Sequence, residues 1–156
     1  GIITSIVNVS FSMLKIIEIK AVLPHIFITV PAFAAVMTVY KDPNCGCCGK
    51  WVKHMEAAGH SVITANTKDM DSIKAALGVP DQLRSCHTAK VDGYVIEGHV
   101  PAADVERLLS ERPEARGLAV PGMPTGSPGM EIPGVSPNSY EIILFDDKKS
   151  QIFSHY

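Results

Sequence analysis

The stretch MTVYKDPNCGCCGKWVKHMEAAGH, residues 37–60, determines how the chain is expected to fold. Residues 37–41 form a short apolar, β-branched run that ends in the turn sequence Asp-Pro-Asn, which predicts a first strand. After a cluster of cysteines, Val52, Met55 and Ala58 share one helical face, and a glycine then ends the helix. The cysteine cluster is therefore predicted to lie at a strand-to-helix junction.

The next segment repeats the order of a strand followed by a helix. SVITAN, residues 61–66, predicts a second strand, and KDMDSIKAALGVP, residues 68–80, predicts a helix capped by Asp69 or Asp71. The residues expected to face inward from this helix are Ile73, Ala76 and Leu77. This βαβα start favours a parallel pair of strands with helices packed against it.

A hairpin and a third helix follow. Residues 87–91 and 94–99 read as strands, and the Asp-Gly pair between them is a strong hairpin indicator. A proline at the first helical position opens a helix over residues 101–112. Its buried stripe is predicted to consist of Val105, Leu108 and Leu109.

The last part of the chain combines a long loop with two strands. Residues 117–139 hold five prolines and five glycines without periodicity, so no regular structure is expected, and so long a loop is usually functional. Residues 140–156 predict a C-terminal β-hairpin that turns at Asp147-Lys148. The order of elements is that of thioredoxins and glutaredoxins. We therefore expect an α/β, thioredoxin-like fold with a mixed central sheet flanked by helices and a long Pro/Gly loop.

Composition limits the classes of protein to which the chain can belong. With 156 residues, of which 46% are hydrophobic and 19% charged, the chain can bury one core, and residues 37–156 are expected to form a single domain. A net charge of −2 provides no basic surface for nucleic acid, so we expect no nucleic-acid partner. Motifs typical of nucleotide-binding proteins, zinc proteases and serine hydrolases do not occur in the sequence.

Residues 1–34 predict an export signal. A weakly positive region precedes an apolar run over residues 21–30, and the sequence AFAA satisfies the rule for signal-peptidase cleavage after Ala34. A retained membrane anchor is the alternative, because residues 21–40 carry no charge. We expect export, no membrane attachment after cleavage, and an oxidising compartment that permits disulfides.

The spacing of the cysteines leaves three kinds of chemistry open. Cys45 and Cys48 form a Cys-x-x-Cys pair, and a helix N-terminus lowers thiol pKa for redox chemistry and metal binding alike. Cys47 favours a metal site, because a third thiolate would compete during disulfide exchange. Clustered thiolates suit Cu(I), with Zn(II) as an alternative. The fourth cysteine, Cys86, is expected to meet the cluster. Two structural disulfides, or a thiol–disulfide oxidoreductase that uses Cys45 and Cys48, remain alternative interpretations.

Histidines offer further donors. His99 ends a predicted strand just before a helix and is a candidate ligand, although a lone histidine is more often structural. His87 follows Cys86 directly, and adjacent residues of a strand point to opposite faces, so the two are not expected to face one site together. Cys86 is the preferred ligand, and His87 stays open as a candidate. His54 and His60 are expected to be solvated.

Two methionines lie in the repeated sequence PGMPTGSPGM, residues 121–130. Met123 and Met130 have no helical stripe around them that would require apolar filler. Thioether sulfur is a good ligand for Cu(I) and a poor one for Zn(II), so these residues favour copper or silver if they bind metal. The alternative is that they fill gaps beneath the loop.

Four segments in this order resemble the bacterial copper-resistance proteins of the CopG type: YKDPNCGCCGKW, LGVPDQLRSCHTA, GYVIEGHVPAADVERLL and GLAVPGMPTGSPGM. The resemblance implies a periplasmic, thioredoxin-like protein of copper or silver resistance. It also implies that the cysteines gather copper ions in a thiolate-bridged multi-copper cluster with a role in copper redox interconversion. The cysteines concerned are Cys45, Cys47, Cys48 and Cys86. His99, Met123 and Met130 fall within the shared segments.

The implied cofactor is copper, chiefly Cu(I), with silver as a substitute. The implied partners are copper efflux or copper-handling proteins of the periplasm. A copper centre that cycles between Cu(I) and Cu(II) would also be a copper oxidoreductase, and the potential of such a centre depends on hydrogen bonds that spacing along the chain does not reveal.

Overall fold

A computed structural model describes residues 36–156, so the predicted export signal over residues 1–34 lies outside the described residues. Within the part that is described, no helix combines the length and apolar character needed to cross a membrane. The elements in chain order are β1 (Val36–Lys41), α1 (Gly46–Ala57), β2 (Ser61–Asn66), α2 (Met70–Ala76), the 3-10 helix η1 (Asp81–Leu83), β3 (Thr88–Val91), β4 (Tyr94–Glu97), α3 (Ala102–Glu111), β5 (Gly117–Ala119), β6 (Glu141–Phe145) and β7 (Ser150–His155).

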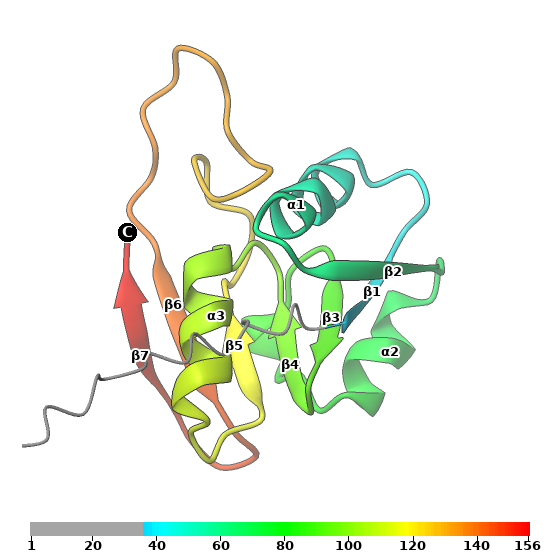
Figure 1. The fold of residues 1–156 in the computed structure, drawn as a ribbon, viewed down its shortest axis with the longest axis vertical. Coiled ribbons are helices and arrows are strands. Elements are labelled where there is room, and N and C mark those ends of the chain that lie inside the picture. The colour runs from blue at the N-terminus through cyan, green and yellow to red at the C-terminus, as the bar shows by residue number, and fades with distance from the viewer. Residues whose placement is uncertain (1–35) are drawn as a thin grey trace, which may run out of the picture. The chain divides into compact units, whose positions relative to one another are not determined.

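The strands form one seven-stranded sheet in the order β2-β1-β3-β4-β5-β6-β7 (Figure 1). The pairs β1/β2 and β4/β5 are parallel, and the other neighbouring pairs are antiparallel. The predicted mixed sheet flanked by helices is thus confirmed. Because Tyr40 near the end of β1 pairs with Thr88 at the start of β3, the chain leaving β1 meets the chain approaching β3.

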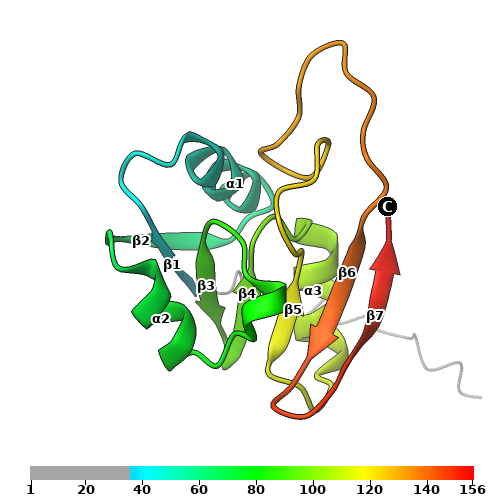
Figure 2. The same cartoon turned by 180° about the vertical axis from the view of Figure 1, so that it is seen from behind.

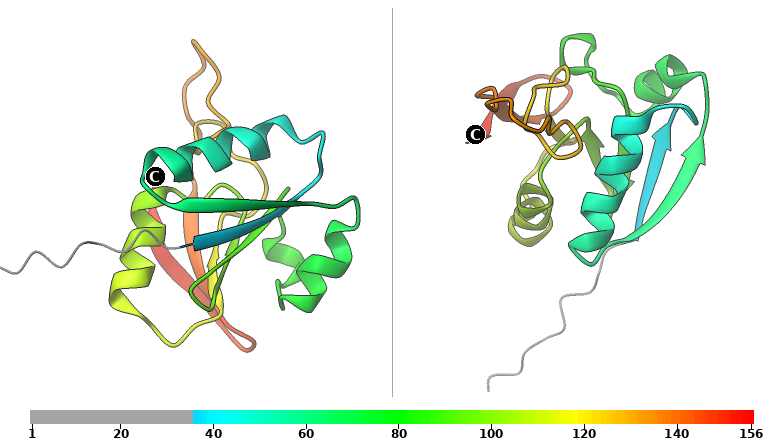
Figure 3. Two further views of the ribbon diagram at one scale, coloured as in Figure 1. Left: turned by 45° about the vertical axis from the view of Figure 1, so that its right-hand side comes forward. Right: turned by 90° about the horizontal axis from the view of Figure 1, so that it is seen from above.

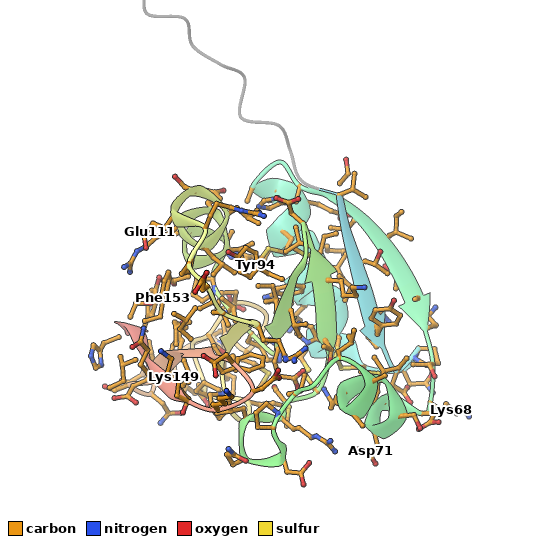
Figure 4. All side chains as sticks on the ribbon, turned by 90° about the horizontal axis from the view of Figure 1, so that it is seen from below. Lys68, Asp71, Tyr94, Glu111, Lys149 and Phe153 are labelled. Carbon is orange, nitrogen blue, oxygen red and sulfur yellow. A yellow bond between two sulfur atoms is a disulfide. The ribbon has the colours of Figure 1, made fainter. Side chains whose placement is uncertain are left out.

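Helices cover both faces of the sheet (Figures 1 and 3). Helices α1 and α3 lie over one face, and α2 lies on the other side. The main core is formed between the sheet and helices α1 and α3, and it includes Trp51 from α1 and Leu108 from α3. Tyr94 belongs to this core and points toward α3, as Figure 4 shows. Val95, the next residue of β4, packs instead in a smaller core on the opposite face. Strand β4 is therefore buried on both faces.

Two predicted helical faces differ from the structure. The fully covered residue of α2 is Lys74, whereas Ile73 and Leu77 are half-buried and Ala76 is exposed. Ala58, predicted to face inward, is the exposed C-cap of α1. In α2 the inward position is occupied by a charged residue because a carboxylate partner is buried beneath it.

Strand β5 corrects the prediction that residues 117–139 lack regular structure throughout. Gly117–Ala119 are buried and lie between β4 and β6. A Cβ atom on Gly117 would stand 1.7 Å from the Val95 carbonyl oxygen, so only glycine permits this close approach. Three residues are too few for a periodic pattern, and the strand exists because its neighbours pair with it.

Short turns join β3 to β4 and β6 to β7. Asp92 and Gly93, between β3 and β4, have φ values of 47° and 89°, as the predicted Asp-Gly turn requires. Strands β6 and β7 pair antiparallel, and the Asp146 N–H donates to the Lys149 carbonyl oxygen at 3.0 Å in the turn between them. The long loop that follows β5 rises beyond the sheet beside α1 and returns to β6 (Figure 2).

Candidate metal centre

The first turn of α1 carries the cysteine cluster, as the sequence predicts. Cys45 is the N-cap of α1 in extended conformation, and its Sγ accepts a hydrogen bond from the Cys48 N–H at 3.3 Å. The turn before it is fixed by Asp42, whose carbonyl oxygen accepts from the Cys45 N–H at 3.1 Å. The polar turn thus sets the start of the helix, and the helix start sets the positions of the sulfurs.

The four cysteine sulfurs lie within 4.8 Å of one another. Cys45 and Cys48 are joined by a disulfide, while Cys47 and Cys86 are free thiols. The Sγ atom of Cys47 lies 3.5 Å from that of Cys45 and 3.9 Å from that of Cys86. Cys48 is buried and the other three are half-buried. Cys47 therefore stands between the disulfide and the cysteine from the distant segment.

Two imidazoles adjoin Cys86. The Cys86 Sγ lies 3.0 Å from the His99 Nε2 and 3.3 Å from the His87 Nδ1, and these three residues form a second group able to hold a metal ion. The expectation that His87 points away from the Cys86 site is wrong. Strand β3 begins at Thr88, so the alternation of side chains along a strand does not apply to residues 86 and 87.

Hydrogen bonds set the orientation of the two imidazoles. The His99 Nδ1 lies 2.8 Å from the Pro128 carbonyl oxygen, which can only accept, so Nδ1 carries the proton and Nε2 presents its lone pair toward Cys86. His87 is fully buried, packs against Trp51 at a ring distance of 4.5 Å, and its Nε2 has no hydrogen-bond partner among the described residues. Both rings are thus held in place before any ion binds.

Burial also controls the protonation of these groups. Burial lowers the pKa of His99. The pKa of His87 is held well below its usual value, chiefly by burial and next by repulsion from the His99 ring when that ring is protonated. Both histidines are therefore neutral at physiological pH, which is the form that binds metal. Burial, and next the neighbouring Cys47 sulfur, raises the pKa of Cys86 to about 12. A metal ion that binds Cys86 must consequently displace its proton.

The Pro/Gly loop packs directly on the cysteine helix. A Cβ atom on Gly129 would lie 2.8 Å from the Cys47 carbonyl oxygen and 2.9 Å from the Trp51 backbone nitrogen. The Gly129 N–H donates to the Glu131 Oε2 at 2.8 Å. Of the two candidate methionines in this loop, Met130 is half-buried and Met123 is 53% exposed. The loop therefore covers the cluster, with Met130 in the covered part and Met123 on the surface.

Two further histidines are more buried than the sequence predicts. The His54 Nε2 accepts a hydrogen bond from the Ala102 N–H at 3.0 Å, and His60 is 8% exposed. The prediction that both are solvated is wrong: His54 is half-buried where α1 packs against the start of α3, and His60 is buried after the end of α1. Their places in the fold are structural.

Sequence reasoning also missed two buried charges beside the centre. Lys74 and Glu97 are 3% and 0% exposed, and Glu97 accepts hydrogen bonds from residues on either side of Cys86 and His87. The available indication was a carboxylate inside the apolar run YVIEGH, residues 94–99, where an unpaired charge would be too costly to bury.

The fold and the site together define an α/β protein with a cysteine cluster capable of binding metal. Two solved structures, described as copper resistance protein CopG in form 2 and form 1, are both 44% identical in sequence to the chain and cover 78% of it. The chain covers 98% and 96% of those structures, with TM-scores of 0.74 and 0.73. The chain therefore belongs to the family of CopG copper resistance proteins.

A family described as "Protein of unknown function, DUF411" also matches the chain, over residues 83–130. This range contains Cys86, His87, His99 and the first half of the loop that covers them. A comparison with curated protein sequences finds no match.

Proposed function

We propose that the chain is a copper-binding protein of copper and silver resistance that holds Cu(I) through the thiolates of its four cysteines. The observation that carries this proposal is the convergence of four sulfurs within 4.8 Å from two segments of the chain. Thiolates are soft donors, and Cu(I) and Ag(I) are soft ions. The cysteines concerned are Cys45, Cys47, Cys48 and Cys86.

More than one copper ion fits this donor set. Sulfurs that lie 3.5 and 3.9 Å apart around Cys47 are close enough for one thiolate to bridge two ions. The Nε2 of His99 and a nitrogen of His87 supply further donors at Cys86. The thioethers of Met130, which is half-buried, and of Met123, which is exposed, would have to turn toward the cluster to bind copper. We therefore propose a thiolate-bridged multi-copper cluster, in which cycling between Cu(I) and Cu(II) would constitute copper oxidoreductase activity.

Binding through all four cysteines requires a reductant. The Cys45–Cys48 disulfide must gain two electrons and two protons before both sulfurs can act as ligands. At the N-terminus of α1 the Cys45 sulfur accepts from the Cys48 N–H, and this bond together with the helix dipole favours the thiolate. The redox state of this pair thus determines how many sulfurs are available to copper.

The proposed fold, cellular location and partners are supported by patterns in the sequence and in the order of elements. A parallel β1-α1-β2 unit, with a Cys-x-x-Cys pair at the start of α1, supports a thioredoxin-like fold. The pattern of residues 1–34 supports export and a periplasmic location of the domain over residues 37–156. Copper efflux or copper-handling proteins of that compartment are the proposed partners.

Mass spectrometry under native conditions tests the proposal. The full chain, reduced and supplied with Cu(I), Ag(I) or Zn(II), is expected to retain several Cu(I) or Ag(I) ions per chain. Zn(II) that displaces copper, or a chain that retains no ion, would refute copper binding. X-ray absorption at the copper edge then distinguishes sulfur from nitrogen ligands and measures any copper–copper distance.

A second candidate function is thiol–disulfide exchange, which the Cys45–Cys48 disulfide favours. Insulin reduction separates the two candidates. Turnover comparable to that of a thioredoxin, lost in Cys48→Ser and kept in Cys47→Ser, would establish the oxidoreductase. Copper binding predicts negligible turnover for all three proteins.

A further inference from the structure

Lys74 and Glu97 form an ion pair that is almost completely removed from water. Their exposed fractions are 3% and 0%, and the Lys74 Nζ lies 2.6 Å from the Glu97 Oε1. Lys74 comes from α2 and Glu97 from the end of β4. Desolvation of two charges offsets most of their attraction, and apolar pairs of similar volume are often equally stable. Stability alone therefore does not account for this pair.

The Glu97 carboxylate binds the chain on both sides of two candidate ligands. The Ser85 N–H donates to Oε1 at 2.6 Å, and the Thr88 hydroxyl donates to Oε2 at 2.6 Å. The Lys74 ammonium donates to the Thr88 Oγ1 at 2.9 Å and so fixes the same hydroxyl. One carboxylate thus holds the residue before Cys86 and the residue after His87.

This segment lies outside the helices and strands that the structure describes, and the Gly98 N–H also holds it by donating to the His87 carbonyl oxygen at 3.0 Å. Helix η1 ends at Leu83 and β3 begins at Thr88, so the candidate ligands lie in the connection between them. Glu97 is also two positions before His99, whose Nε2 lies 3.0 Å from the Cys86 Sγ. The carboxylate therefore joins the segment that carries Cys86 to the strand end that carries His99.

We propose that Glu97, held by Lys74, is a positioning residue of the metal centre, because its carboxylate fixes Cys86 and His87 relative to His99. This inference rests on the proposed function and names a determinant of affinity at the same site. Groups that orient metal ligands through hydrogen bonds typically change metal affinity by 10–100-fold when they are removed.

Two substitutions at Thr88 test the role of the hydrogen bonds. Thr88→Val keeps the shape and removes the hydroxyl, whereas Thr88→Ser keeps the hydroxyl and removes a methyl group. The dissociation constant for Cu(I), measured on the reduced full chain by competition with bicinchoninate, is expected to rise about tenfold in Thr88→Val and to stay unchanged in Thr88→Ser. A role limited to packing predicts the reverse order and would overturn the proposal.

A double variant removes the ion pair without leaving one charge unpaired. Lys74→Met/Glu97→Leu is expected to weaken Cu(I) binding by 10–100-fold. Asp104→Asn is the matched control, since Asp104 is another buried carboxylate and accepts from the Ser154 and Tyr156 hydroxyls. Its substitution should leave the affinity unchanged. Equal losses of affinity in the double variant and in Asp104→Asn would show a general effect of stability and refute positioning.

A measurement without metal separates this inference from the proposed function. Amide hydrogen exchange of Ser85 and Cys86 in the reduced, metal-free chain is expected to be at least tenfold faster in the double variant, relative to Leu118 in β5. Unchanged exchange would overturn the positioning role even if copper binds. If the wild-type chain binds no Cu(I), the proposed function fails, and this exchange ratio alone decides whether Glu97 positions Cys86.

Discussion

The Nε2 atom of His99 lies 3.0 Å from the Sγ atom of Cys86, although the two residues are separated by 13 positions along the chain. The other ring nitrogen of His99 lies 2.8 Å from the Pro128 carbonyl oxygen. One imidazole therefore connects the cysteine that precedes β3 with the loop that covers the cluster. A change in the ligands around Cys86 or in the position of the loop would therefore move this ring.

Substitution of His99 by asparagine separates these two contacts. The Asn amide can donate to Pro128 as Nδ1 does, but it carries no nitrogen at the position of Nε2. We expect His99→Asn to bind Cu(I) with less nitrogen scattering at the copper edge than the wild type, since His87 still offers a nitrogen, and with a roughly tenfold weaker affinity. His54→Asn is the control, because His54 bonds to Ala102 and should leave the copper spectrum unchanged. Nitrogen scattering as strong in His99→Asn as in the wild type would exclude His99 as a ligand.

Removal of the Cys47 thiol should reduce the number of copper ions bound. Cys47 is the central sulfur, at 3.5 Å from Cys45 and 3.9 Å from Cys86. It does not cap α1, so Cys47→Ser should preserve the helix content measured by far-ultraviolet circular dichroism. Native mass spectrometry is expected to show fewer Cu(I) ions per chain than in the wild type. An unchanged number of ions would mean that Cys47 is not a copper ligand.

Local sequence predicts the parts of the fold whose geometry is set locally. The Asp-Pro-Asn turn places the start of α1, and Asp92 and Gly93 adopt the positive φ values that their hairpin requires. Strand β5 could not be predicted in this way. Its three residues carry no periodicity, and Gly117 is required only because the Val95 carbonyl approaches it from another strand.

The candidate site shows the same division between local and distant causes. The meeting of Cys86 with the cysteine cluster follows from the pairing of β1 with β3 and was predicted from the order of elements. The orientation of His87 was mispredicted, because it depends on where β3 begins. The burial of Lys74 could not be predicted from α2 alone, since its carboxylate partner lies on β4.

Alanine at Gly129 should loosen the loop that covers the cluster. The residue has a φ of +88°, and an added Cβ would meet the Cys47 carbonyl oxygen at 2.8 Å. Gly134 is a matched control, because its φ is +78° but nothing lies within 4 Å of an added Cβ. Backbone strain costs about 1–2 kcal/mol in both variants.

Only Gly129→Ala carries the additional clash. We expect a larger fall in the free energy of unfolding for Gly129→Ala than for Gly134→Ala in urea denaturation. We also expect faster transfer of Cu(I) from Gly129→Ala to a chelator. Equal stability and equal transfer rates in the two variants would show that the loop does not control access to the cluster.

The stability of the metal-free protein with its Cys45–Cys48 disulfide formed should fall at alkaline pH because of Cys86. Burial raises the pKa of this thiol to about 12, whereas an unfolded cysteine has a pKa of about 8.5. Below pH 8.5, roughly, both states bind the proton and the group has no effect on the free energy of unfolding. Between these two pKa values the folded state binds more protons than the unfolded state, so the free energy of unfolding decreases as the pH rises.

Urea denaturation of wild type and Cys86→Ser at a series of pH values measures this effect. Other groups titrate in both proteins, so the difference between the two isolates Cys86. We expect the stability of the wild type to decline relative to Cys86→Ser as the pH rises from about 8.5 toward 12. A constant difference across this range would mean that the thiol is not shielded from water, and the proposed cost of displacing its proton when copper binds would then be absent.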